Sequence, residues 1–471
     1  MMWARRIRKA QGRRAWLKLR FLFLALSAIW ISGCGSLPNA SAYTRSRFFY
    51  HRPKFVGTQG RPISTSAGKA IIAQLEQSAG KTDILKRHLA FEQAITGVPL
   101  TLGNKATLLQ DGPNTYKAMF DAIRDATDSI NVEVYIFSDD SVGQKFADAL
   151  IAKQRSGVQV NLIYDSFGSH RTPPSFFDNM KEAGVQVLEF NPVNPLSARV
   201  RWSPDHRDHR KLTVVDGKIA FTGGINISGD YESTSHGRKI DPAESWRDTD
   251  VQVEGPAVTE FQRLFISTWE SQNGPPLSPR DYFPPLGKKG EEIVRVIGSA
   301  PEEFSLIYVD LISAINNAET KIYITDAYFA PGREMLEALE AAVGRGVDVR
   351  LLVPGKIDEP LMALATRADY AGLLQAGVQI YEWQGKMIHS KTATIDDVWS
   401  TVGSMNLDWW SIARNSEISA VILSYEFAKQ MDFMFNADLE RSDKIERAQW
   451  EHRPCHERAA EMFGKMIEPT L

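Results

Sequence analysis

Cysteine is nearly absent from this 471-residue sequence, which contains only Cys34 and Cys455. Two cysteines so far apart exclude a small scaffold held together by disulfides, and no cysteine cluster predicts a metal centre. A membrane-spanning run is also missing, because the longest apolar stretch, 21–31, is shorter than the roughly 20 residues that a bilayer requires. The apolar fraction of 43% is ordinary, so the chain can bury large cores.

Acidic residues are missing from the first 33 positions, which read as an export signal. Basic side chains precede the apolar run 21–31, and Ile31-Ser32-Gly33-Cys34 follows it directly. This order resembles a bacterial lipobox and predicts removal of residues 1–33 and lipid attachment at Cys34. The alternative to lipid attachment is that Cys34 is a free, buried cysteine that follows two small residues by chance. Arg13-Arg14 leaves general secretion and twin-arginine export both open.

Net charge separates the signal from the rest of the chain. The formal charge is −2, and the first 33 residues carry eight of the positive charges, which leaves −10 for the remainder. A negative body repels the phosphate backbone, so nucleic acid is disfavoured as a partner.

An internal repeat divides the body into two halves. Ser156-Gly157-Val158 matches Arg345-Gly346-Val347, and Ala183-Gly184-Val185 matches Ala376-Gly377-Val378. Two copies indicate duplicated domains, because a solenoid needs at least three. The expected division is a signal peptide (1–33), an N-terminal extension (34–98), a first domain (99–273), a Pro/Gly-rich linker (274–290), a second domain (291–425) and a C-terminal helical tail (426–471).

Each half alternates between strand and helix patterns. In the first half, β-branched and aromatic residues predict strands at 131–137 and 158–164, with a helix between them that ends at Gly157. In the second half, strands are expected at 321–329 and 347–353, with a helix from about Arg333 that ends at Gly346. The alternation predicts an α/β fold of mostly parallel sheets flanked by helices.

The strongest signal is a pair of constellations separated by 180 positions. The first consists of His209, Lys211, Asp216, Gly224 and Asn226. The second consists of His389, Lys391, Asp396, Ser404 and Asn406.

Local geometry suggests how each constellation is arranged. A histidine and a lysine two residues apart lie on one strand face. A two-residue turn at Asp216-Gly217 would place His209 opposite Gly224, and the same pairing would place His389 opposite Ser404. The small residue would leave room for an anion, and the aspartate would lie about 23 Å away at about 3.3 Å per residue, in a structural role.

The repeated His-x-Lys-x4-Asp pattern resembles that of the phospholipase D superfamily, over about residues 100–425. The resemblance implies two domains related by a pseudo-twofold axis around one phosphodiester site, with no cofactor and no metal. One histidine would form a covalent phosphohistidine and the other would protonate the leaving alcohol. The usual family order assigns the nucleophile to His209 and the acid to His389. Lysines, asparagines and the small residues would bind the phosphoryl group, namely Lys211, Lys391, Asn226, Asn406, Gly224 and Ser404.

A carboxylate is expected to orient each histidine from a strand shortly after the motif. Glu417 is the candidate in the second half. In the first half Asp248 is preferred, and Asp250 remains open because it shares the same strand face.

Segments such as Leu108-Leu109-Gln110-Asp111-Gly112 and Val253-Glu254-Gly255-Pro256 resemble bacterial cardiolipin synthases. The implied function is transfer of a phosphatidyl group between two phosphatidylglycerol molecules, by a membrane-attached protein that needs no obligatory protein partner. Cys34 would hold it on the extracytoplasmic side of the cell membrane or the outer membrane. A hydrolytic phospholipase D, a nucleic-acid phosphodiesterase and a non-catalytic scaffold are the alternatives.

Overall fold

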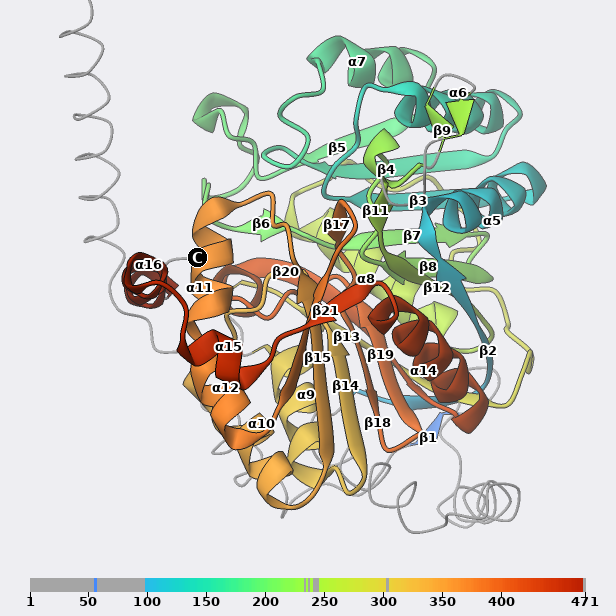
Figure 1. Ribbon diagram of the computed structural model, residues 1–471. Coiled ribbons are helices and arrows are strands. Elements are labelled where there is room, and N and C mark those ends of the chain that lie inside the picture. The colour runs from blue at the N-terminus through green and yellow to red at the C-terminus, as the bar shows by residue number, and fades with distance from the viewer. Residues whose placement is uncertain are drawn as a thin grey trace, which may run out of the picture.

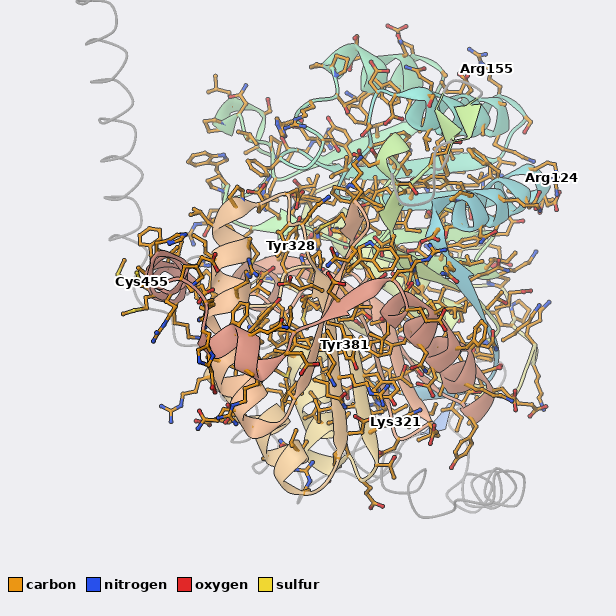
Figure 2. All side chains as sticks on the ribbon, viewed as in Figure 1. Arg124, Arg155, Lys321, Tyr328, Tyr381 and Cys455 are labelled. Carbon is orange, nitrogen blue, oxygen red and sulfur yellow. The ribbon has the colours of Figure 1, made fainter. Side chains whose placement is uncertain are left out.

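The computed structural model describes residues 55–56, 98–232, 234–235, 238–239, 245–301 and 305–468. Cys34 and the predicted signal lie outside these ranges. The first half occupies the upper part of Figure 1, and the second half the lower part. Cys455, the free thiol, is exposed at the start of the last helix (Figure 2).

The first half surrounds a set of adjoining strands with helices. Its principal elements are β2 (Leu100–Gln110), α5 (Asp111–Asp125), β3 (Ser129–Val134), α6 (Ser141–Arg155), β4 (Gln159–Asp165), α7 (Pro174–Glu182), β5 (Gln186–Phe190), β7 (Lys211–Val215), β8 (Ile219–Gly223), β12 (Thr249–Glu254) and α8 (Val258–Ser271). Its short elements are η1 (Pro195–Ser197), β6 (Arg207–Asp208), η2 (Gly229–Tyr231), β9 (Thr234–Ser235), β10 (Arg238–Lys239) and β11 (Trp246–Arg247). The short strand β1 (Phe55–Val56) pairs with β2.

The second half repeats this order. Its elements are β13 (Glu292–Ser299), α9 (Leu306–Asn317), β14 (Lys321–Thr325), α10 (Gly332–Gly344), β15 (Asp348–Pro354), α11 (Pro360–Ala368), α12 (Tyr370–Ala376), β16 (Gln379–Trp383), β17 (Met387–Ile388), β18 (Thr392–Ile395), β19 (Trp399–Gly403), α13 (Trp409–Ala413) and β20 (Asn415–Leu423). The chain ends with α14 (Tyr425–Leu439), β21 (Ser442–Lys444), α15 (Arg447–Glu451) and α16 (Cys455–Ile467). The tail, predicted to be helical, therefore also contains β21, which pairs with β16.

The sheets are mixed, which corrects the expectation of mostly parallel strands. In each half three neighbours are parallel, β3-β4-β5 and β14-β15-β16. The hairpins β7-β8 and β18-β19 join them antiparallel, and β12 and β20 continue in that sense. Antiparallel pairing of β2 with β13 connects the two halves. The strand order is thus repeated on either side of the β2-β13 junction, as a duplicated fold requires.

The two halves share a core in addition to their own. Buried residues of β12, such as Val251 and Val253, belong to one apolar cluster with Val402 of β19 and Ile418 of β20. Helices α8 and α14 contribute to this cluster through Phe265 and other side chains. Because apolar burial is the main favourable term in folding, the halves form one cooperative body.

The hairpins differ from the expected pairing by one residue. Val215 pairs with Ile219, and Ile395 pairs with Trp399, so each turn has three residues instead of two. Asp216 and Asp396 begin these turns with φ of 51° and 53°. Their carboxylates accept backbone N–H groups at the start of the neighbouring strand, from residues 127–129 and 319–321 respectively. These bonds account for the left-handed aspartates and for the structural role expected of both.

Candidate active site

The two histidines are held by strands from opposite halves. His209 follows β6, which pairs in parallel with the start of β20, and its N–H donates to the Ser416 carbonyl (2.9 Å). His389 follows β17, which pairs in parallel with β11, and its N–H donates to the Arg247 carbonyl (2.7 Å). Each histidine therefore lies beside the residue that precedes a carboxylate of the other half.

The carboxylates are exchanged between the halves. Nδ1 of His209 lies 2.9 Å from Oε1 of Glu417, and Nδ1 of His389 lies 2.8 Å from Oδ2 of Asp248. The sequence identified both carboxylates but considered each within its own half, which is wrong. Asp250 does not contact His389 and accepts the N–H of Ile225 instead (3.1 Å).

Both lysines point into the same site. Nζ of Lys211 donates to the His209 carbonyl and lies 5.2 Å from the ring centroid of Tyr135. Nζ of Lys391 donates to the His389 carbonyl and lies 6.0 Å from the ring of Tyr328, which Figure 2 places between the two halves. Burial lowers the pKa of Lys211 most, and the charge of Lys391 lowers it further, so the two motifs are electrostatic neighbours.

The small residues lie against the carboxylates, and phosphate binding at Gly224 and Ser404 stays a prediction. A Cβ at Gly224 would lie 2.2 Å from Oδ1 of Asp248. Ser404 at the matching position donates its hydroxyl to Glu417. The shorter aspartate thus faces a glycine, and the longer glutamate faces a serine.

The two asparagines have different surroundings. Asn226 accepts the N–H of Ile136 (3.1 Å) and donates to the Tyr231 hydroxyl (3.1 Å). Asn406 donates weakly to Ser411 (3.4 Å), while its buried Oδ1 has no hydrogen-bond partner among the described residues. Phosphate binding by the two asparagines stays a prediction.

Aromatic side chains that the sequence did not single out surround the histidines. The Tyr231 hydroxyl lies 3.3 Å from Nδ1 of His389, and the Trp246 ring lies 5.2 Å from its imidazole. Tyr135 packs edge-on against His209 at 4.9 Å. Tyr135 directly follows β3, and ligands of such sheets bind at the carboxyl ends of parallel strands. Its position could therefore have indicated from the sequence that Tyr135 belongs to the site. Tyr231 lies outside the repeat and gave no comparable signal.

Burial controls the protonation of the site. It lowers the pKa of His209 to about 4 and of His389 to about 3, and it lowers the pKa of Lys211 to about 7. Burial alone would raise the pKa of Asp248, but the hydrogen bond and charge of His389 lower it below its ordinary value. At neutral pH both imidazoles are therefore neutral, with Nδ1–H donated to a carboxylate.

The depressed histidine pKa predicts how stability responds to acid. Between pH 6.5 and about 4 the unfolded chain protonates position 209 and the folded chain does not, so the free energy of unfolding falls as the pH is lowered. The free energy of unfolding should fall between pH 7.5 and pH 4.5 by on the order of 2 kcal/mol less in His209→Gln than in the wild type. Denaturant titrations at pH 7.5 and pH 4.5 measure it. The exposed His452 provides the control variant His452→Gln, and equal pH slopes for all three proteins would contradict the prediction.

The close contact at Gly224 predicts a large effect from one methyl group. Gly224→Ala must displace the buried Asp248 carboxylate from His389, and orienting carboxylates are typically worth 10–100-fold in activity. We expect kcat to fall by about that factor, as measured by steady-state kinetics. Ser404→Ala is the matched comparison, because it removes one hydroxyl without adding an atom. A smaller loss in Gly224→Ala than in Ser404→Ala would contradict this role.

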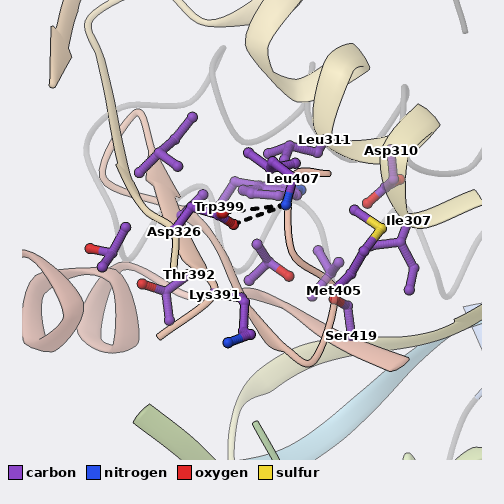
Figure 3. A pocket seen from close by; sticks show the side chains of 15 residues that line it. Ile307, Asp310, Leu311, Asp326, Lys391, Thr392, Trp399, Met405, Leu407 and Ser419 are labelled. Carbon is purple, nitrogen blue, oxygen red and sulfur yellow. Dashed lines mark hydrogen bonds between the residues drawn. The ribbon is translucent and has the colours of Figure 1, made fainter. Parts of the chain in front are cut away.

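A small cavity lies beside Lys391 in the second half. Its volume is about 30 Å³, and its walls include Lys391, Asp326 and Leu407. Figure 3 shows Asp326 bonded to the backbone of Leu407, with the amine of Lys391 directed away from Leu407. This space is of the order of one water molecule, so it is part of the core and not a substrate site.

Comparison with known proteins agrees with this geometry. Residues 119–266 and 311–439 match the family described as "Cardiolipin synthase, PLD-like domain". Cardiolipin synthase 1 of Staphylococcus epidermidis is 34% identical over 377 residues, which span 79% of this chain and 75% of that protein. The cardiolipin synthase of Halalkalibacterium halodurans is 32% identical over 403 residues, spanning 84% and 78%. Phosphatidylserine synthase of Haemophilus influenzae Rd KW20 has the same fold, with a TM-score of 0.60 at 14% identity, covering 82% of this chain and 99% of that one.

The duplicated fold and its paired His-x-Lys motifs define a phospholipase D-like protein. Within that class, the chain belongs to the cardiolipin synthase family. No helix in the described part of the chain is long and apolar enough to cross a membrane. The described residues also contain no group of three His, Cys, Asp or Glu side chains that could hold a metal ion.

Proposed function

We propose that this protein is a phosphatidyltransferase that makes cardiolipin from two molecules of phosphatidylglycerol. The observation that carries the proposal is the pair of buried histidine–carboxylate contacts flanked by Lys211 and Lys391, in a chain of this family. A neutral imidazole is a competent nucleophile, and lysine ammonium groups stabilise the charge that grows on a phosphoryl group in transit. The arriving anionic phosphate favours the charged form of both lysines.

In the first step Nε2 of His209 attacks the phosphorus of one phosphatidylglycerol. The bond from phosphorus to the glycerol oxygen breaks, and His389 donates a proton to that oxygen, so that glycerol leaves. The phosphatidyl group is then covalently bound to His209. Because the substrate phosphate is an anion, its arrival between the histidines raises the pKa of His389, and this favours the protonated acid that the step needs.

In the second step His389 accepts the proton of a hydroxyl on the second phosphatidylglycerol. That oxygen attacks the phosphorus, the bond to His209 breaks, and cardiolipin is released. His209 returns to its neutral form, held by Glu417. His389 regains its proton in this step, so one turnover leaves the protonation of the site unchanged.

The assay uses purified full-length protein with phosphatidylglycerol vesicles, and thin-layer chromatography separates the products. Cardiolipin and glycerol in equal amounts are the expected result. Phosphatidic acid without cardiolipin would identify a hydrolase instead. If the wild type forms no product, the protein is a non-catalytic scaffold. If it hydrolyses only a nucleic-acid diester, it is a nucleic-acid phosphodiesterase and not a lipid enzyme.

We also propose that the mature protein begins at Cys34 with a lipid attached, on the extracytoplasmic side of a membrane. Supporting this, the basic stretch, the short apolar run and the small residues before Cys34 follow one another as lipoprotein processing requires. Mass spectrometry of the N-terminus of the native protein tests the attachment, with Cys34→Ser as the control. An unmodified chain that starts at Met1 would contradict it.

A further inference from the structure

Two loop segments of the first half, 166–173 and 192–203, form an exposed apolar surface that we name the rim. Of the described residues 98–232 and 245–273, the exposed large apolar side chains all belong to these two segments. They are Phe167 (52% exposed), Val193 (47%), Leu196 (94%) and Trp202 (47%). Exposed apolar side chains gathered in this way mark an interaction surface.

The charge of the rim is opposite to that of the body. Its two segments contain no Asp or Glu, and they expose His170, Arg171, Arg199 and Arg201. The loop of the second half that corresponds to 166–173 is 355–361, which exposes Lys356 and Leu361 but also Asp358 and Glu359. Among these loops, only those of the first half therefore combine a tryptophan, aliphatic side chains and arginines.

The rim is joined directly to the catalytic residues. The Ser169 hydroxyl donates to the Tyr135 carbonyl (3.0 Å), and Gly168 packs so closely on Tyr135 that a Cβ there would lie 2.2 Å from its carbonyl oxygen. Tyr135 in turn contacts His209. The N–H of Val193 donates to the Ser166 hydroxyl (3.0 Å), which ties the second segment to the first.

We propose that the rim docks on the surface of an anionic phospholipid bilayer and places the His209 side of the site at the headgroup level. Tryptophan and arginine favour the membrane–water interface, and arginine is attracted to anionic headgroups. The proposal rests on the proposed function, which requires two lipid substrates to reach a buried site. A phosphodiester can then enter beside His209 while its acyl chains stay in the bilayer.

Fluorescence from the rim tests the docking separately from catalysis. A polarity-sensitive dye is attached at Leu196→Cys in a full-length Cys455→Ser background, and the parent without Leu196→Cys shows any signal from Cys34. On phosphatidylglycerol vesicles the dye at 196 shifts to the blue and is quenched by lipids carrying a quencher on their acyl chains. The matched control is Phe433→Cys, an 80% exposed apolar position on α14, which stays solvent-like.

Equal, solvent-like signals at 196 and 433 would overturn the proposal. Protection of position 196 that depends on protein concentration and not on lipid would also overturn it, in favour of a second copy of this chain. Neither result depends on turnover, so the docking is decided even if the proposed function fails.

A kinetic comparison supplies the second readout. The double variant Arg199→Glu/Arg201→Glu should raise the ratio of KM for vesicular phosphatidylglycerol to KM for a short-chain, monomeric form by at least about tenfold, because reversal of two charges opposes an anionic surface. An unchanged ratio would overturn the proposal. If neither substrate is converted by the wild type, the proposed function fails and the fluorescence alone decides the docking.

Discussion

Replacement of His209 by asparagine is expected to lower kcat for cardiolipin formation by at least about 10⁴-fold, because the residue that forms the covalent bond is removed. The buried position of His209 makes stability a separate concern, so denaturant unfolding at pH 7.5 accompanies the kinetics. His452→Asn, at an exposed histidine, is the control and should retain wild-type turnover. Turnover by His209→Asn within tenfold of the wild type would contradict a nucleophilic role.

The same comparison assigns the two histidines. An acid is needed for a poor leaving group such as glycerol and much less for a phenolate with low proton affinity. His389→Asn should therefore lose cardiolipin synthesis but recover at least about 10²-fold in the first step with a nitrophenyl phosphatidyl ester. His209→Asn should not recover. Recovery of His209→Asn alone would reverse the two roles.

Loss of the exchanged carboxylates is expected to have the second largest effect. Glu417→Gln and Asp248→Asn keep the shape of each side chain but remove the charge that holds Nδ1–H, and such changes lower kcat by about 10²–10⁴-fold. Activity alone does not reveal which histidine each carboxylate serves. Nitrogen NMR of labelled histidine does, because the tautomer of each ring follows its Nδ1 partner.

The structure predicts a crossed pattern in that experiment. Glu417→Gln should change the resonances of His209 and leave those of His389 in place, and Asp248→Asn should do the reverse. Changes confined to the histidine of the same half would contradict the exchange. A consequence of the exchange is that neither half alone contains a complete histidine–carboxylate pair.

Local features of the site could be predicted from the sequence. The spacing of 180 residues between matching positions identified both motifs, and strand periodicity placed His209 and Lys211 together. The alternation of strand and helix patterns also predicted the repeated α/β units. Each of these inferences rests on residues that are close together in the sequence. The hairpin turns were misplaced by one position, because Asp216 bonds to residues 127–129, which lie far from the hairpin in the sequence.

The features that the sequence did not reveal depend on contacts between distant segments. The exchange of Asp248 and Glu417 follows from β6 pairing with β20 and β11 pairing with β17, across about 140 to 210 residues. The mixed sheet has the same origin, because the order of strands is a property of the whole fold. The close contact of Gly224 with the Asp248 carboxylate was likewise not visible in the sequence, because Asp248 lies 24 positions further along the chain.

A covalent intermediate on His209, which carries the phosphatidyl group during turnover, can be trapped directly. Phosphatidylglycerol labelled with ³²P is mixed with enzyme, the reaction is quenched in alkali within one turnover, and the labelled peptide is identified by mass spectrometry. The expected result is an acid-labile, alkali-stable label on His209 that disappears on addition of unlabelled phosphatidylglycerol, as labelled cardiolipin forms. Cardiolipin formation without any labelled histidine, or with the label on another residue, would contradict it.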